Sequence, residues 1–259
     1  MKKSILIITL FALNHLHAQL PSRPKAFFGL QAGYSLDAAP QAIGSSNSGT
    51  LRSLVTGSFG NGMTIGANAG IMLTKSFGAE LGLSYLHGSS ISIPTTNGNT
   101  DLQSQFIQAK PSIILMADLL KIKPYAKFGM NIAKGNIKGK SNITSGSNIS
   151  YQESELSGGL AIGFQSSLGI QLPIGPKLAA FGELNYQLMS YAPSEGKITK
   201  ATTNGIDNLS SMTTRDINTV FVESYDTSVS SSSTEPRKQL KQYYNMNSVG
   251  LNVGMKIIF

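Results

Sequence analysis

The last twelve residues of the chain, SVGLNVGMKIIF (248–259), carry a bulky apolar residue at every second position. Most of the positions between them hold Gly, Asn or Lys. Successive side chains of a β-strand point to opposite faces, so this alternation predicts a strand with one apolar and one polar face. The pattern occurs in eight segments, namely 26–36, 62–73, 77–86, 106–117, 125–133, 156–172, 178–188 and 248–259.

The connections between these segments alternate in length. Three are short (74–76, 118–124 and 173–177), and four are long and polar (about 37–60, 87–103, 134–154 and 190–242). Short turns at one end and long loops at the other are typical of outer-membrane barrels. The predicted fold is therefore all-β, an eight-stranded antiparallel up-and-down transmembrane β-barrel with short periplasmic turns and long surface loops. A ten-stranded barrel, with 217–225 in an extra hairpin, is the alternative topology.

The character of the polar face distinguishes a membrane barrel from a soluble one. A soluble barrel turns its apolar face inward and shows charged residues to water. Here the second face is mainly Gly, Ser, Asn and Gln, small enough for the narrow interior of eight strands. The apolar face carries no charge in any segment, as lipid requires, since a lysine or arginine at the midplane costs about 2–4 kcal/mol. We therefore expect the apolar face to point toward lipid.

Composition and the N-terminus indicate export. Charged residues make up 13% of the chain, and there is no cysteine for a disulfide or thiolate metal site. Residues 1–18 have the charged start, apolar stretch and small-residue end of a signal peptide. The predicted organisation is a signal peptide (1–18), a short periplasmic tail (19–25) and a barrel domain (26–259). The net charge is +8, but the lysines are scattered, so we expect no nucleic-acid partner.

Aromatic residues are expected to form two girdles at the membrane interfaces. The girdle at the short-turn end would contain Phe28, Phe77, Tyr125 and Phe259, and the girdle at the long-loop end Tyr34, Tyr85, Phe106, Tyr186 and Tyr191. Pro111 lies inside a predicted strand and cannot donate a ladder hydrogen bond, so we expect a bulge or local fraying there.

These features, with the C-terminal GLNVGMKIIF, resemble small outer-membrane β-barrel proteins of the OmpA-transmembrane-domain and OmpX type. The resemblance covers roughly 26–259 and implies location in the outer membrane of a Gram-negative bacterium, among its lipid and lipopolysaccharide. It also implies an assembly signal, read by the barrel-assembly machinery, at Val253, Met255, Ile257 and Phe259. We expect a monomer without a cofactor or metal site.

Five charged residues fall on the polar faces of the strands and so define a predicted lumen charge network: Glu80, Lys110, Lys127, Glu183 and Lys256. Neighbouring strands permit Glu80–Lys110 and Glu183–Lys256 pairs, which would plug the interior. The alternative interpretation is a narrow passive pore for ions or small solutes. For eight strands, whose interior is barely wide enough for side chains, we favour the plug.

His87 and Ser89 have the spacing of the residues used by barrel enzymes that modify lipid A. That chemistry also needs a carboxylate to orient the imidazole, and the neighbouring segment 106–117 contains no Glu. We therefore expect no enzymatic activity, with the lipid A-modifying enzyme as an alternative.

The long loops are the remaining candidates for function, because loops on a rigid scaffold commonly bind partners. In the last loop, 219–225 alternates and is expected to extend a strand above the membrane, whereas 234–242 has a short-helix signal at Thr234 and Pro236. The predicted role is structural or in surface interaction, such as adhesion or partner binding, carried by the first and last loops (37–60 and 190–242).

Overall fold

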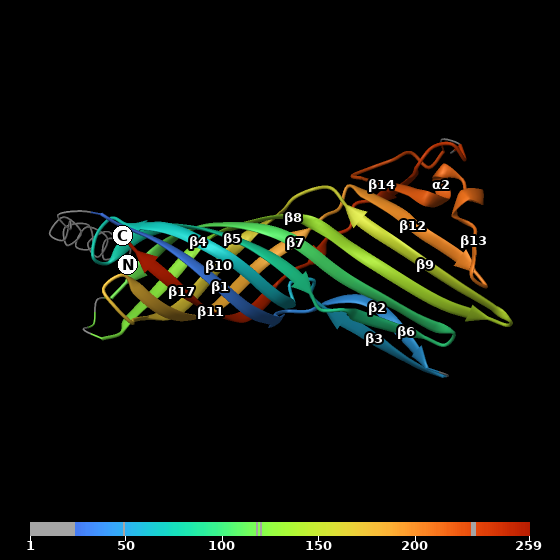
Figure 1. The fold of residues 1–259 in the computed structure, drawn as a ribbon. Helices are drawn as coiled ribbons and strands as arrows, with labels where there is room; N and C mark the ends of the chain where they lie inside the picture. The colour runs from blue at the N-terminus through green and yellow to red at the C-terminus, as the bar shows by residue number, and fades with distance from the viewer. Residues whose placement is uncertain (1–23, 49, 118, 120, 229–231) are drawn as a thin grey trace, which may run out of the picture.

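The protein is described by a computed structural model that covers residues 24–259 except 49, 118, 120 and 229–231. The predicted signal peptide and most of the predicted tail lie outside the described residues. The fold is almost entirely β-structure (Figure 1). Within the described residues, no helix has the length and apolar character needed to cross a membrane.

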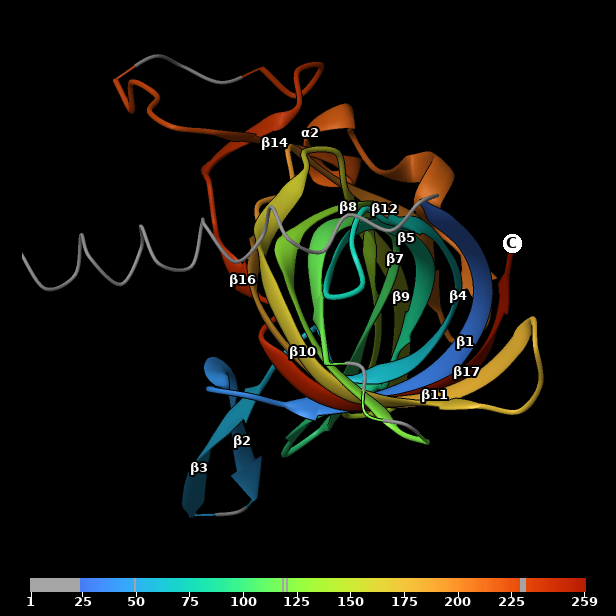
Figure 2. The same cartoon turned by 90° about the vertical axis from the view of Figure 1, so that its left-hand side faces the viewer.

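Eight strands close into a barrel, seen end-on in Figure 2. Each strand is antiparallel to both neighbours, and β17 pairs with β1 to complete the ring. In order around the barrel, the strands are β1 (Lys25–Asp37), β4 (Gly62–Met72), β5 (Phe77–Gly88), β7 (Gly98–Met116), β8 (Lys123–Ser145), β10 (Ala161–Pro173), β11 (Leu178–Tyr191) and β17 (Ser248–Ile258). Closure leaves no unpaired edge in the membrane, where an unsatisfied backbone group costs several kcal/mol.

The apolar faces point outward. Leu30 on β1 and Leu168 on β10 are 61% and 67% exposed, whereas Asn68 on β4 and Asn131 on β8 are at most 1% exposed. This arrangement is the reverse of a soluble barrel, and it gives lipid a continuous apolar surface. The eight-stranded barrel predicted from the alternation is confirmed.

The long connections are not irregular loops. β7 and β8 continue past the barrel, where they pair up to Gly98 and Ile143. Further strands lie beside them and form what we call the extension (Figure 1). Its elements are β2 (Gln41–Ser48), β3 (Leu51–Gly57), β6 (Ile91–Thr95), β9 (Asn148–Ser157), β12 (Glu195–Thr203), β13 (Ile206–Asp207), the 3-10 turn η2 (Leu209–Ser211), α2 (Thr214–Ile217), β14 (Asn218–Val222) and β15 (Arg237–Leu240); β16 (Tyr244–Asn245) returns the chain to β11.

The predicted strand 156–172 is divided in the structure. β9 ends at Ser157 and β10 begins at Ala161, with Gly158 and Gly159 between them at φ 76° and 70°. Left-handed backbone suits glycine and interrupts an extended strand. The alternation continued across this break, so the sequence pattern merged one strand of the extension with one strand of the barrel.

The expectation at Pro111 holds in part. Pairs between β7 and β8 stop at Ala109 and resume at Ser112, as expected from a missing N–H. The register is the same on both sides, so the ladder is interrupted without a bulge.

The last loop rules out the ten-stranded alternative and departs from one expectation. β14 pairs with β12 and β15 in the extension, so it extends a strand above the membrane and adds no hairpin to the barrel wall. The helix predicted over 234–242 is wrong, because Arg237–Leu240 forms β15, parallel to β14. A helical signal of nine residues is weak on its own, and pairing with an existing strand satisfies the backbone of this segment instead.

Candidate functional site

Four of the five predicted network residues form one buried ionic cluster across the barrel interior. Lys127 Nζ on β8 lies 2.7 Å from Glu80 Oε1 on β5 and 2.8 Å from Glu183 Oε2 on β11. Lys256 Nζ on β17 lies 3.3 Å from Glu80 Oε2. Asn252 and Tyr125 donate further hydrogen bonds to Glu183, at 3.2 and 2.9 Å. Each carboxylate therefore has several charged or polar donors.

The predicted pairs Glu80–Lys110 and Glu183–Lys256 are wrong. In the ladder, Glu80 lies opposite Ser112, and Glu183 lies opposite Asn252, four residues from Lys256 along β17. Four residues span about 13 Å of strand, beyond the reach of a direct pair. The ion pairs instead cross the narrow lumen between strands that are not neighbours.

Lys110 is the network residue that the cluster does not include, since it forms no ion pair with a described residue. It lines a separate cavity of about 10 Å³ with Gln108, Gln187 and Asn252. A cavity of this size is comparable to the minimum needed for one water molecule.

An aromatic layer lies on the periplasmic side of the cluster. Its rings are those of Phe27, Tyr125 and Phe181, which pack with Ile114, and all four residues are buried. Lys256 Nζ lies 4.7 Å from the ring centroids of both Phe27 and Phe181, so part of its charge faces aromatic rings. Gly169 makes room for this layer, because an added Cβ would lie 2.5 Å from the Tyr125 ring. The girdle position predicted for Tyr125 is wrong, since its ring points into the lumen.

An apolar layer closes the opposite end of the lumen. Phe106 and Tyr191 pack edge-to-face at 4.8 Å, and both are fully buried, so their predicted girdle positions are also wrong. The segment before β4 folds into the barrel mouth, where Ser104 Oγ donates to the Phe59 carbonyl at 2.7 Å. The same layer contains Leu86, Ala133, Ile137, Ala161, Met189 and Met246. Two apolar layers around an ionic cluster argue against a continuous water pathway.

The remaining predicted girdle residues lie mostly on the outer surface near the two ends of the barrel, where the membrane interfaces are expected. Tyr34, Tyr85 and Tyr186 are exposed on the outer surface near the extension, and Phe28 and Phe259 are exposed at the other end. Phe77 is half-buried. The residues of the predicted assembly signal, Val253, Met255, Ile257 and Phe259, all point outward and are 46–70% exposed. Their recognition by an assembly machinery remains a prediction.

His87 and Ser89 do not form a catalytic arrangement. The His87 ring contacts Gln103 Nε2 at 3.1 Å, and Ser89 Oγ contacts the Tyr34 hydroxyl at 2.9 Å and Asn61 at 3.4 Å. None of these partners is a carboxylate. In the part of the chain that the structure describes, no group of three or more His, Asp or Glu could hold a metal ion.

The extension has a charged outer face that the alternation of apolar residues does not predict. Lys138 on β8, Glu155 on β9 and Lys197 on β12 lie directly opposite one another in the ladder. A second row contains Lys140, Glu153 and Lys200. A register shift between Ile198 and Lys200 keeps both β12 lysines aligned with the two glutamates. We call these six residues the Lys–Glu–Lys rows; their signal in the sequence was alternation of Lys with Gly in 134–140.

One family model matches most of the chain and agrees with the fold. The family model described as "Outer membrane protein beta-barrel domain" matches residues 4–208. Among solved structures, the chain is similar to the Neisserial surface protein A, with 11% identity, 90% of this chain and 96% of that chain covered, and a TM-score of 0.35. A loop-deletion mutant of the outer membrane protein OmpT of Vibrio cholerae has 6% identity, coverage of 92% and 98%, and a TM-score of 0.10. A search of curated proteins finds no match. The matched span includes most of the barrel, and the chain belongs to the outer membrane protein beta-barrel domain family.

Proposed function

We propose that this outer-membrane barrel acts in surface interaction through its extension, and that the Lys–Glu–Lys rows bind the anionic saccharide layer of lipopolysaccharide. The observation that carries this proposal is a change along one face of β8. Phe128 and Met130 are exposed on the lipid-facing side of the barrel. Lys134, Lys138 and Lys140 follow on the same side of the same strand, because all five differ by even numbers of residues.

The position of these lysines suits the layer just outside the lipid. Lys134 lies opposite Ile107, an apolar residue that is 65% exposed on the barrel surface. Six residues separate Lys134 from Lys140, about 20 Å along the strand. The lysines therefore start at the end of the apolar surface and continue away from it, where phosphate groups and sugars of neighbouring lipopolysaccharide would lie.

The rows have positive charge that the protein does not neutralise. Each row holds two lysines for one glutamate, and both glutamates already accept hydrogen bonds, Glu155 from Asn136 and Glu153 from Tyr151. Lys138, Lys140 and Lys197 form no ion pair with a described residue, and all are exposed. Exposed ammonium groups are effective ligands for phosphate.

Binding of rough lipopolysaccharide (lipid A with core sugars) to the purified full chain in nanodiscs tests the proposal. The variant Lys138→Gln/Lys140→Gln/Lys197→Gln/Lys200→Gln should bind at least tenfold more weakly than wild type. Binding to wild type should also weaken as salt rises, because exposed charges are screened. Dephosphorylated lipopolysaccharide should bind no better to wild type than to the variant.

The matched control is Arg237→Gln/Lys238→Gln/Lys241→Gln, which removes three exposed or half-buried cations in or next to β15, an edge strand two strands away from β12. It should bind within twofold of wild type. Equal binding by wild type and the quadruple variant, or binding that is insensitive to salt, would overturn the proposal. Migration of the folded barrel on gels without heating reports whether each variant has assembled.

A further inference from the structure

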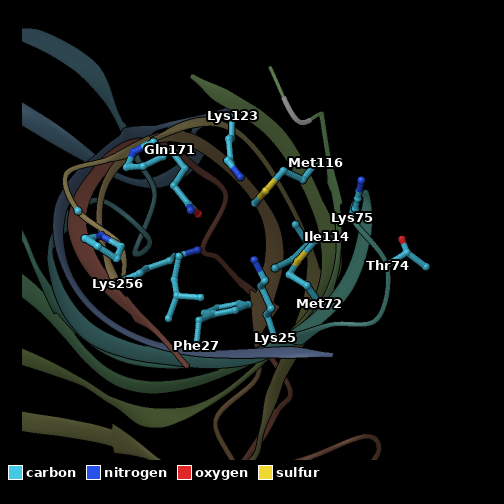
Figure 3. Close-up of a pocket in the computed structure, with 14 residues that line it drawn as sticks. Lys25, Phe27, Met72, Thr74, Lys75, Ile114, Met116, Lys123, Gln171 and Lys256 are labelled. Carbon is cyan, nitrogen blue, oxygen red and sulfur yellow. The ribbon is translucent and has the colours of Figure 1, made fainter. Parts of the chain in front are cut away.

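The periplasmic mouth of the barrel holds a cavity of about 210 Å³ that the proposed function does not use (Figure 3). Its walls combine two chemistries. Phe27, Met72, Ile114, Met116 and Ile258 supply apolar surface, and Lys25, Lys123, Lys256 and Gln171 supply polar donors. In Figure 3 these lysines and Gln171 point into the ring of strands, whereas Lys75 and Thr74 point away from it.

From this combination, we infer that the mouth is a binding site for a small organic anion with an apolar body, such as a short-chain carboxylate. Acidic side chains are absent from the described lining. Ammonium groups attract an anion, and the apolar wall removes the ligand's hydrocarbon from water. A cavity of this volume has room for several water molecules, which suits a ligand of that size.

Two residues of the lining have polar groups that the fold leaves available. Gln171 is only 5% exposed, yet its side-chain amide forms no hydrogen bond with a described residue. The amide lines the cavity, where an anion in the mouth would accept its N–H groups. Lys25, at the start of β1, is exposed and forms no ion pair with a described residue.

The deep side of the cavity is closed by the ionic cluster. Lys256 forms its ion pair with Glu80, and the rings of Phe27 and Phe181 lie beside its ammonium group. A ligand that enters from the periplasm would therefore stop at the aromatic layer and not pass through the barrel. This geometry indicates a binding pocket at a closed end, independent of the extension on the other side of the membrane.

Methyl NMR of methionine-labelled protein in nanodiscs of zwitterionic lipid tests the inference, with hexanoate as the probe. Hexanoate should shift the Met72 and Met116 methyl resonances saturably and leave those of Met63 and Met255, which face lipid, unchanged. Acetate, inorganic phosphate and the neutral hexanamide should each bind at least fivefold more weakly, because each lacks one of the two interactions.

Lys25→Gln and Gln171→Leu should each weaken hexanoate binding at least threefold. Lys177→Gln is the matched control, because Lys177 lies at the same rim, where its carbonyl accepts from the Ile258 N–H, but does not line the cavity. Equal binding of hexanoate and hexanamide would overturn the inference, as would equal losses in Lys25→Gln and Lys177→Gln or tight binding of phosphate alone.

A second set of nanodiscs distinguishes two sources of the anion. If phosphatidylglycerol in the bilayer shifts the two methionine resonances without hexanoate, a lipid headgroup supplies the anion. If it does not, and hexanoate still binds, the ligand is a soluble anion of the periplasm. Either result supports the site, while absence of any shift with both probes would overturn it.

Discussion

The barrel and the extension share strands, but the outward face of a shared strand is apolar in the barrel and charged in the extension. Within the barrel, β8 turns Phe128 and Met130 outward and Lys127 inward, where that ammonium group is held between two carboxylates. Beyond the barrel, the same strand turns Lys138 and Lys140 outward. Its register with β7 is the same on both sides of this boundary, while its other neighbour changes from β10 to β9. The comparison indicates that the medium around the strand, lipid or water, determines whether its outward face carries apolar or charged residues.

The largest expected effect is in the barrel interior. Lys127→Ala leaves Glu80 and Glu183 buried without their shared partner, and breaking a buried pair in this way costs about 3–5 kcal/mol. Urea unfolding of the refolded barrel measures the loss, and Lys140→Ala in the extension is the control, expected within about 0.5 kcal/mol. A loss below about 1 kcal/mol would contradict the role of the cluster. Planar-bilayer conductance of Lys127→Ala should stay near that of wild type, because both apolar layers remain.

A smaller effect is expected when the same charge is added to the same face of β8 on the two sides of the boundary. Met130→Lys should destabilise the folded barrel by about 2–4 kcal/mol, because Met130 faces lipid. Asn142→Lys, exposed in the extension, should change stability by less than about 0.5 kcal/mol. Unfolding in lipid vesicles compares the two variants. Similar costs at both positions would mean that the boundary lies elsewhere along the strand.

The smallest expected effect is a pH dependence confined to the extension. The hydroxyl of Thr213 donates to Asp216 at 2.7 Å, which lowers the pKa of Asp216, with Arg237 nearby at 3.5 Å. The folded-state pKa therefore lies below the unfolded value of about 3.9. Ionised Asp216 stabilises this region above that value, and the stabilisation is lost as the pH falls through the folded-state pKa.

Hydrogen exchange, corrected for intrinsic rates, should accordingly show faster opening of β14 and β15 near pH 3 than near pH 6. The barrel strands should show no matching change. Asp216→Asn should remove the difference between the two pH values, and a dependence that persists in this variant would assign the effect to another group.

The barrel was predictable from sequence because lipid imposes a strict alternation on every strand that it touches. No charge interrupts the apolar faces, so all eight strands were found, and only Gly158 and Gly159 were misread as part of one. The extension was not predictable in this way. Both of its faces meet water or other strands, so Lys138 and Glu155 leave no apolar alternation to detect.

The lumen was predictable in composition but not in its pairs. The odd or even position of each residue along its strand predicts that Glu80, Lys127 and Glu183 point inward. Which of them pair depends on the strand register and on the width of the lumen, and the alternation pattern carries no information about either. Tyr125 and Phe106 were assigned to the girdles from their positions near strand ends. Parity points both rings inward, and glycines such as Gly169 supply the space they occupy.

The pairing of β1 with β17 also determines when the barrel can close during folding. Phe27 pairs with Ile258, so the first strand to be synthesised waits for the last one before the ring can close. Contacts this distant in sequence form slowly. Until then, the open edge of β1 could pair with a strand of another chain. A nascent molecule therefore stays open to such pairing until β17 reaches β1 and closes the ring.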